Sequence, residues 1–97
     1  PTAYFINCAR GEIVNEPDLI EALKNKKIAG AALDVFSSEP LPMDSPLFKL
    51  DNLIMTPHNA ALTKEATMRM ALHAAIGIDE VLSGKKPSWP VNNPKIK

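Results

Sequence analysis

Short apolar runs alternate with stretches of helical periodicity along the first part of the 97-residue chain. The first run, Ala3–Asn7, is rich in strand formers and suits a strand that is buried on both faces. A helical period follows over Glu16–Lys24, with Asn15 as its N-cap. The second run, Ile28–Phe36, could be helix or strand by composition alone, but Gly30 and the preceding helix favour a strand.

The next part of the chain predicts a loop and a third strand. Ser37–Asp51 carries three prolines and reads as a loop, with one helical turn near Leu47. Leu53–Thr56 is a third short strand, which Pro57 stops. Strands that alternate with helical segments predict an α/β fold with a parallel sheet and helical crossovers.

A long helix follows, in which Thr63 is the N-cap, the last turn lies near Ser83, and Gly84 occupies the C′ position. Its apolar stripe is wider than that of a surface helix, so we expect the sheet and something outside the chain to cover it on two sides. The segment Lys85–Lys97 reads as an extended tail. We expect the chain to be a fragment of a larger protein, marginal on its own, with residues 1–84 as one structural piece.

Composition narrows the classes of function. Eleven basic and eleven acidic residues give a net charge of zero, which offers no reason to expect nucleic acid or an anionic membrane as a partner. Cys8 is the single cysteine, so an internal disulfide is impossible and a reducing compartment such as the cytoplasm is favoured. No apolar run approaches the roughly 20 residues that span a bilayer. Two histidines and one cysteine make no metal-ligand pattern, so we predict no metal site.

Four polar side chains follow the three predicted strands. Arg10 comes after the first strand, Asp34 and then Glu39 after the second, and His58 after the third. Taken singly, each has a plain structural explanation as a turn, cap or surface residue. In parallel α/β sheets, however, ligands bind beyond the carboxyl ends of the strands. Their joint placement therefore predicts a functional site at this edge.

The same segments carry a family resemblance. In chain order they are Asn7-Cys8-Ala9-Arg10-Gly11, Gly30-Ala31-Ala32-Leu33-Asp34-Val35-Phe36, Glu39-Pro40-Leu41-Pro42, Ser45-Pro46-Leu47 and Thr56-Pro57-His58. Over roughly Phe5–Glu65 the chain resembles the D-isomer-specific 2-hydroxyacid dehydrogenases. The resemblance implies the second half of a Rossmann-type NAD-binding domain, with the order strand-helix-strand-loop-strand-helix. The tail, residues 85–97, would lead towards an absent substrate domain.

The resemblance also assigns roles to residues. It implies that Arg10, Glu39 and His58 are catalytic. Asp34 would contact the carboxamide of the nicotinamide, and the full set of cofactor-binding positions would be Cys8, Ala9, Arg10, Asp34, His58 and Ala60. NAD is the implied cofactor, and NADP is not excluded, because the deciding residue falls outside this chain. The phosphate-cradling Gly-x-Gly-x-x-Gly loop is absent from the sequence.

The residue types suit hydride transfer between NAD(H) and a 2-keto or 2-hydroxy acid. A protonated His58 can give its proton to the carbonyl oxygen, and a carboxylate at Glu39 would hold the ring and favour its charged form. Arg10 offers a planar fork for the substrate carboxylate. Many family members have glycines where this chain has Ala60 and Ala61, so the backbone there approaches a cofactor less freely.

Other interpretations stay open at this point. Some relatives are corepressors that sense the dinucleotide, and their active-site residues are similar, so an NAD(H)-sensing binding protein is the alternative to an enzyme. An unrelated α/β fragment is a third possibility. The resemblance further implies a homodimeric, cytoplasmic parent, with the remainder of its own chain as a partner and no activity in the fragment alone. Cys8 is interpreted as a small buried packing residue rather than a nucleophile.

Overall fold

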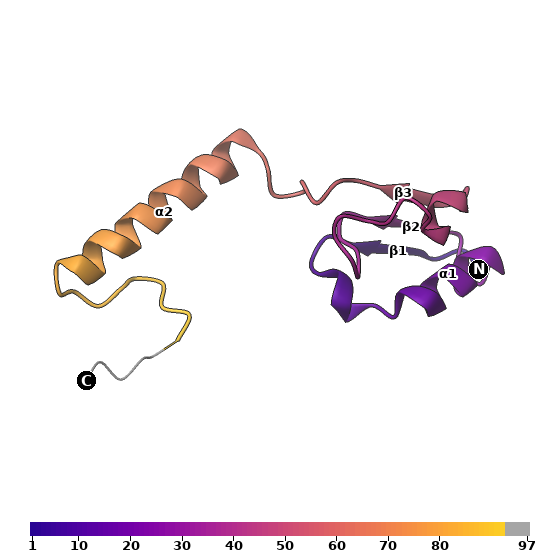
Figure 1. The fold of residues 1–97 in the computed structure, drawn as a ribbon, viewed down its shortest axis with the longest axis horizontal. Coiled ribbons are helices and arrows are strands. Elements are labelled where there is room, and N and C mark those ends of the chain that lie inside the picture. Colours follow the sequence, from indigo (N-terminus) through magenta and orange to yellow (C-terminus); the bar gives the residue numbers. More distant parts are fainter. Residues whose placement is uncertain (93–97) are drawn as a thin grey trace. The chain divides into compact units, whose positions relative to one another are not determined.

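A computed structural model describes residues 1–92 of the chain. The chain divides into two compact units (Figure 1), and the division falls between Ala60 and Ala61 in the sequence. This boundary falls inside the stretch 1–84 that the sequence predicts as one structural piece, and the assignment of that stretch to half a dinucleotide-binding domain stays a prediction.

The first unit contains a three-stranded parallel sheet in the order β1-β2-β3. The strands are β1 (Tyr4–Asn7), β2 (Gly30–Leu33) and β3 (Leu53–Met55). Asn7 pairs with Leu33, and Leu33 pairs with Met55, so all three strands end level with one another. The parallel α/β arrangement predicted from the sequence is confirmed.

The helix α1 (Glu16–Lys24) joins β1 to β2 and has the predicted bounds. It begins where Asn15 Oδ1 accepts a hydrogen bond from the backbone N–H of Asp18, at 3.4 Å. This bond satisfies one of the free donors at the helix start. Two 3₁₀ turns complete the unit, η1 (Gly11–Ile13) and η2 (Pro46–Lys49). The second of these is the helical turn predicted near Leu47.

The core of the first unit lies on one face of the sheet, where α1 covers it (Figure 1). Its buried members come from the helix, from the sheet and from the following loops: Leu19, Ile20, Leu23, Ala31, Leu33, Phe36 and Leu47. On the other face the side chains of Tyr4, Ile6 and Ile54 are exposed among the described residues. The expectation that the first strand is buried on both faces is therefore wrong for this chain. Side chains alternate along a strand, and α1 covers only one set.

The second strand is shorter than the apolar run Ile28–Phe36 that predicted it. It ends at Leu33, and the backbone N–H of Phe36 donates to the Glu39 carboxylate instead of to a neighbouring strand. Apolar composition continues past the strand because Val35 and Phe36 are buried in loop conformation.

The second unit is built on α2 (Lys64–Leu82), which follows its Thr63 N-cap and ends before Gly84, whose φ is +72°. None of the helix residues is buried among the described residues, although many are apolar. After the helix, Ser88 donates two hydrogen bonds to the Glu80 carboxylate, and the Trp89 ring stacks on His73 with 4.3 Å between centroids. The tail to residue 92 has neither helix nor strand, and residues 93–97 of that tail lie outside the described residues.

No helix among residues 1–92 combines the length and the apolar character that crossing a bilayer requires.

Three glycines give a graded test of packing in the full-length protein. A Cβ on Gly11 would lie 1.9 Å from the Phe36 carbonyl oxygen, a Cβ on Gly30 would lie 2.8 Å from the Asn52 carbonyl oxygen, and a Cβ on Gly77 meets no described atom within 4 Å. We expect Gly11→Ala to lower the free energy of unfolding most, by about 1–3 kcal/mol or more, and Gly30→Ala to lower it less. Gly77→Ala adds helix propensity of at most about 1 kcal/mol. Thermal unfolding of the three variants checks the order, and a Gly11→Ala protein as stable as the parent would contradict it.

Candidate active site

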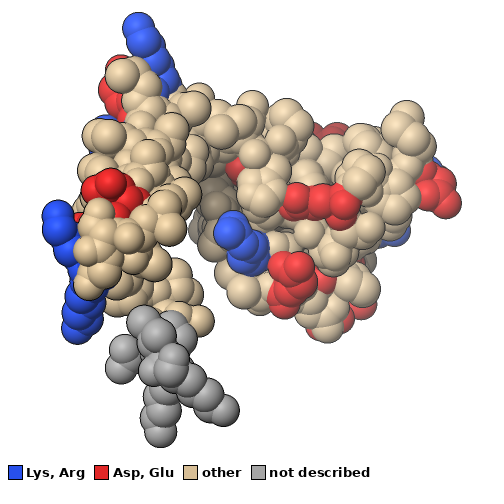
Figure 2. Space-filling view, turned by 60° about the vertical axis from the view of Figure 1, so that its left-hand side comes forward, with Lys and Arg blue, Asp and Glu red and all other residues tan. Residues whose placement is uncertain are grey.

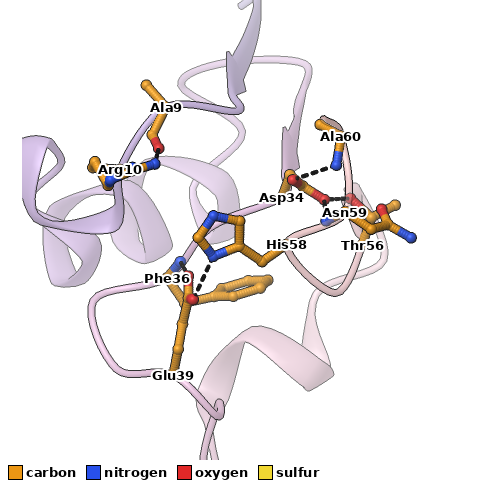
Figure 3. Close-up of polar contacts among 9 residues, drawn as sticks. All are labelled: Ala9, Arg10, Asp34, Phe36, Glu39, Thr56, His58, Asn59 and Ala60. Carbon is orange, nitrogen blue, oxygen red and sulfur yellow. Dashed lines mark hydrogen bonds and ion pairs between the residues drawn. The ribbon is translucent and has the colours of Figure 1, made fainter. Parts of the chain in front are cut away.

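The level ends of the three strands bring the loops that follow them to one edge of the sheet. These loops carry Arg10 after β1, Asp34 and Glu39 after β2, and His58 after β3, and Figure 3 shows the four side chains around a common region. The structure thus brings together the candidate residues that the sequence indicated. Their chemical roles remain predictions.

His58 and Glu39 form a direct pair. His58 Nδ1 lies 2.6 Å from Glu39 Oε2, and the other carboxylate oxygen, Oε1, accepts the backbone N–H of Phe36 at 3.0 Å. The hydrogen bond from His58 is the main cause that lowers the pKa of Glu39 below its ordinary value of 4.5, and the Phe36 N–H adds to it. The Glu39 carboxylate is therefore charged at neutral pH and held from two sides.

The pair remains open to solvent within this chain. The side chains of His58 and Glu39 are 47% and 36% exposed. In Figure 3 the second ring nitrogen of His58, Nε2, points away from Glu39. Since Glu39 occupies Nδ1, Nε2 is the nitrogen that can exchange a proton with a ligand.

His58 has a left-handed backbone conformation, with φ at +51°. A residue with a Cβ seldom adopts it, and surrounding contacts must hold it there. The backbone N–H groups of the next two residues, Asn59 and Ala60, both donate to the Asp34 carboxylate, at 3.0 and 2.9 Å. Successive N–H groups that converge on one anion form a nest. Asp34 is the anion of this nest, so it fixes the turn that presents His58.

Asp34 is 3% exposed, and Thr56 Oγ1 donates a third hydrogen bond to it, at 2.5 Å. This bond is the largest cause that lowers the pKa of Asp34 below 3.8, followed by the bond from Ala60. Oδ1 takes two donors and Oδ2 takes one, which leaves acceptor capacity on Oδ2. Asp34 can therefore hold the loop and still accept from a ligand.

Sequence reasoning missed Thr56 as a residue that holds the candidate site through its bond to Asp34. The parallel register could have revealed it, because Leu33 pairs with Met55 and the residues after them, Asp34 and Thr56, come next to each other. A hydroxyl beside a buried carboxylate at a strand end is the signal that was available in the sequence.

Removal of the Thr56 hydroxyl should make the full-length protein more sensitive to acid. The folded-state pKa of Asp34 is depressed, so its contribution to stability is present above pH 3.8 and is lost as pH falls through the depressed value. Thr56→Val removes the main cause of the depression, and we expect acid unfolding to begin at higher pH. Thr56→Ser keeps the hydroxyl and is the matched control. Circular dichroism against pH measures the midpoints, and equal midpoints for Thr56→Val and the parent would contradict the expectation.

Arg10 is an exposed cation in a loop of small residues. Its Nη1 donates to the carbonyl oxygen of Ala9 at 2.7 Å, and its charge helps to lower the pKa of Glu39. In residues 1–60 acidic side chains outnumber basic ones by eight to five. Figure 2 shows acidic side chains spread over the visible face of this unit. Residues 1–60 therefore offer little general electrostatic attraction to an anion.

The neighbours of Arg10 differ from the prediction in one respect. Cys8 was expected to be buried, but its thiol is free and exposed. Cys8 lies one residue beyond β1, where the chain has left the sheet face that α1 covers. Ala9 and Ala60 are also exposed, and the backbone N–H groups of both already donate to side chains, to Asn7 and Asp34 respectively.

The unit has the architecture of open parallel α/β domains, in which ligands bind beyond the carboxyl ends of the strands. Residues 1–60, which are the first unit of the structure, match the family model described as D-isomer specific 2-hydroxyacid dehydrogenase, NAD binding domain. The chain belongs to the D-isomer-specific 2-hydroxyacid dehydrogenase family.

Similar proteins agree with this assignment. The chain is 51% identical over 96 residues to a glyoxylate reductase of Thermofilum pendens, covering 99% of the chain and 28% of the relative. It is 49% identical over 94 residues to a D-3-phosphoglycerate dehydrogenase of Methanocaldococcus jannaschii, covering 97% of the chain and 18% of the relative. The chain thus spans less than a third of the length of these relatives.

A solved structure is similar in fold as well as in sequence. The D-isomer specific 2-hydroxyacid dehydrogenase of Xanthobacter autotrophicus Py2, in complex with NADPH and MES, superimposes with a TM-score of 0.77 at 42% identity. The match covers 93% of this chain and 36% of the Xanthobacter chain. The fold is thereby confirmed as part of a Rossmann-type NAD-binding domain, the kind of domain whose cofactor is NAD or NADP.

Proposed function

We propose that the protein containing this chain reduces 2-keto acids to D-2-hydroxy acids with a reduced nicotinamide cofactor, and catalyses the reverse oxidation. The observation that carries the proposal is the His58–Glu39 pair, in which His58 Nδ1 lies 2.6 Å from the Glu39 carboxylate. Arg10 lies at the same edge of the sheet. Family membership and the names of the relatives support it.

In this proposal His58 acts as the general acid of reduction. A bound nicotinamide would supply the hydride for the carbonyl carbon, and negative charge would then grow on the carbonyl oxygen. The imidazolium of His58 donates its Nε2 proton to that oxygen and keeps the Nδ1 proton on the Glu39 side. Glu39 stabilises the imidazolium before the transfer and keeps the ring oriented during it. The oxidation runs the same transfer backwards, with neutral His58 as the base.

Arg10 has the role of binding the substrate carboxylate. Its guanidinium can form two parallel hydrogen bonds to a carboxylate, which fixes both the position and the rotation of the acid. Among residues 1–60 the other basic side chains are Lys24, Lys26 and Lys27, which precede β2, and Lys49, which precedes β3. Arg10 is therefore the lysine or arginine of residues 1–60 that lies in the loop directly after a strand.

The polar and small residues at this edge fit a nicotinamide. The remaining acceptor capacity of Asp34 Oδ2 suits an amide NH₂, and the small exposed side chains of Cys8, Ala9 and Ala60 leave room for a flat ring. We propose that Asp34 accepts from the carboxamide, and that these residues and His58 and Arg10 surround the ring. The pyrophosphate would be held by parts of the protein outside this chain.

Turnover of the full-length protein tests the proposal. We expect oxidation of NADH or NADPH when glyoxylate, hydroxypyruvate or pyruvate is added, followed by the loss of absorbance of the reduced nicotinamide. The same assay with His58→Ala protein is the control for contaminating activity. Binding of the cofactor without turnover of any of these acids would instead support a dinucleotide-sensing protein and contradict the proposal.

The 97-residue chain alone should show no turnover in the same assay. The chain covers 28% of the glyoxylate reductase relative, so it would contain only one part of the cofactor site. It also leaves apolar side chains of β1, β3 and α2 exposed.

We further propose that the full-length protein is a cytoplasmic homodimer. Sedimentation of the full-length protein at two concentrations tests the dimer, and a monomer at both would contradict it.

A further inference from the structure

Asn7 is a buried amide at the end of β1 that the proposed chemistry does not use. It is 5% exposed, and both polar atoms of its side chain have hydrogen-bond partners. Its carbonyl oxygen accepts the backbone N–H of Asp34 at 3.0 Å, which ties its main chain to the loop after β2. Its side chain is directed to the loop that carries Arg10.

The side chain of Asn7 binds that loop at two points. Oδ1 accepts the backbone N–H of Ala9 at 3.0 Å, and Nδ2 donates to the carbonyl oxygen of Arg10 at 2.9 Å. One acceptor and one donor on the same short side chain are needed, and asparagine supplies both. Aspartate has the same shape but lacks the donor, and its second oxygen would face the Arg10 carbonyl oxygen.

The far end of the loop is fixed in another way. Arg10 has an extended backbone, with φ −143° and ψ 144°, and is followed by Gly11, which packs directly against the Phe36 carbonyl group. The N–H of the same Phe36 holds the Glu39 carboxylate. The loop of residues 8–10 is thus held by Asn7 at its start and, at its end, by the backbone segment that also holds Glu39.

We propose that Asn7 is a positioning residue for Arg10: it fixes the Arg10 backbone at the distance and orientation from the His58–Glu39 pair that binding of the substrate carboxylate requires. Asn7 does not touch the substrate and acts through Arg10. The inference rests on the proposed function, in which Arg10 binds the acid.

A double-mutant cycle in the full-length protein, with glyoxylate as the keto acid, tests this coupling. We expect Asn7→Asp to raise KM for glyoxylate about tenfold, with a smaller change in kcat, because a misplaced Arg10 weakens binding before chemistry. In an Arg10→Ala background the same change should alter KM less than about twofold, because the side chain through which Asn7 acts is then absent. A purely structural role would produce the same fold-change in both backgrounds.

Ser45→Ala is the matched control. Ser45 is also buried and binds a backbone N–H through its side chain, but it lies at the start of η2 and outside the site. We expect Ser45→Ala to leave KM for glyoxylate unchanged even where it lowers the melting temperature. If Asn7→Asp does not fold, Asn7→Ser takes its place in the cycle, because serine keeps an acceptor and lacks the amide donor.

Each outcome separates the two levels of the proposal. Equal effects of the Asn7 variant with and without Arg10 overturn the positioning role and leave the proposed function intact. An Arg10→Ala protein with unchanged KM overturns the substrate-binding role of Arg10, and the inference on Asn7 falls with it. No turnover of glyoxylate or of the other keto acids overturns both.

Discussion

Replacement of His58 by alanine is expected to lower kcat/KM for keto-acid reduction in the full-length protein by about 10²–10⁴-fold. The variant keeps the loop anchored, because the bonds from Asn59, Ala60 and Thr56 to Asp34 use groups outside the imidazole. It loses the proton donor for the carbonyl oxygen. Steady-state kinetics measure the loss, and an unchanged circular dichroism spectrum would show that the variant is folded. Near-parental kcat/KM would remove His58 from the mechanism.

The partner substitution Glu39→Gln separates charge from shape. The pKa of Glu39 is depressed below 4.5, so its negative charge is present throughout the range around pH ~6.5 in which histidines ordinarily titrate. Glutamine keeps the shape and removes the charge that stabilises the imidazolium. Reduction needs the imidazolium, so its rate should begin to fall at lower pH in Glu39→Gln than in the parent. Oxidation needs the neutral ring and should begin to rise at lower pH.

The pH dependence of kcat/KM in both directions is the measurement. A shift of both limbs toward lower pH supports the pair. Superimposable profiles for the parent and Glu39→Gln would show that the 2.6 Å contact does not govern the proton on His58.

Arg10→Lys is expected to raise KM for the keto acid by about 10–100-fold, although the charge is kept. Lysine loses the planar fork, so it cannot form two parallel bonds to the substrate carboxylate. The acidic balance of residues 1–60 supplies no general attraction that would compensate. Lys49→Ala is the matched control, since Lys49 is exposed and precedes β3. KM values for the acid and for the cofactor, measured separately, check the prediction, and a parental KM for the acid in Arg10→Lys would contradict it.

Local signals in the sequence predicted the regular elements well. The helix Glu16–Lys24 has its predicted bounds because its cap and its apolar period agree, and Thr63 and Gly84 mark the ends of α2 for the same reason. The second strand was predicted too long because burial, and not strand geometry, made the run apolar as far as Phe36.

The residues of the candidate site could be predicted as a set, but their contacts could not. Position after a strand end places Arg10, Asp34, Glu39 and His58 at one edge, and this follows from topology alone. The left-handed turn at His58 and the bonds from Thr56 and Asn7 depend on tertiary register and on backbone angles. Composition and periodicity do not give the angles or the contacts, so the left-handed turn and the hydrogen bonds of Thr56 and Asn7 were found only in the structure.

The way the site is anchored has an evolutionary consequence. The strand ends are in register, and Asp34 accepts hydrogen bonds from the two backbone N–H groups that follow His58. One residue inserted between Thr56 and Ala60 would therefore turn the imidazole away from Glu39. The stretch around Met43 is exposed, and it rejoins the sheet only after η2. Insertions and deletions among homologous lineages should therefore collect near Met43, while the segment Thr56–Ala60 should keep a constant length.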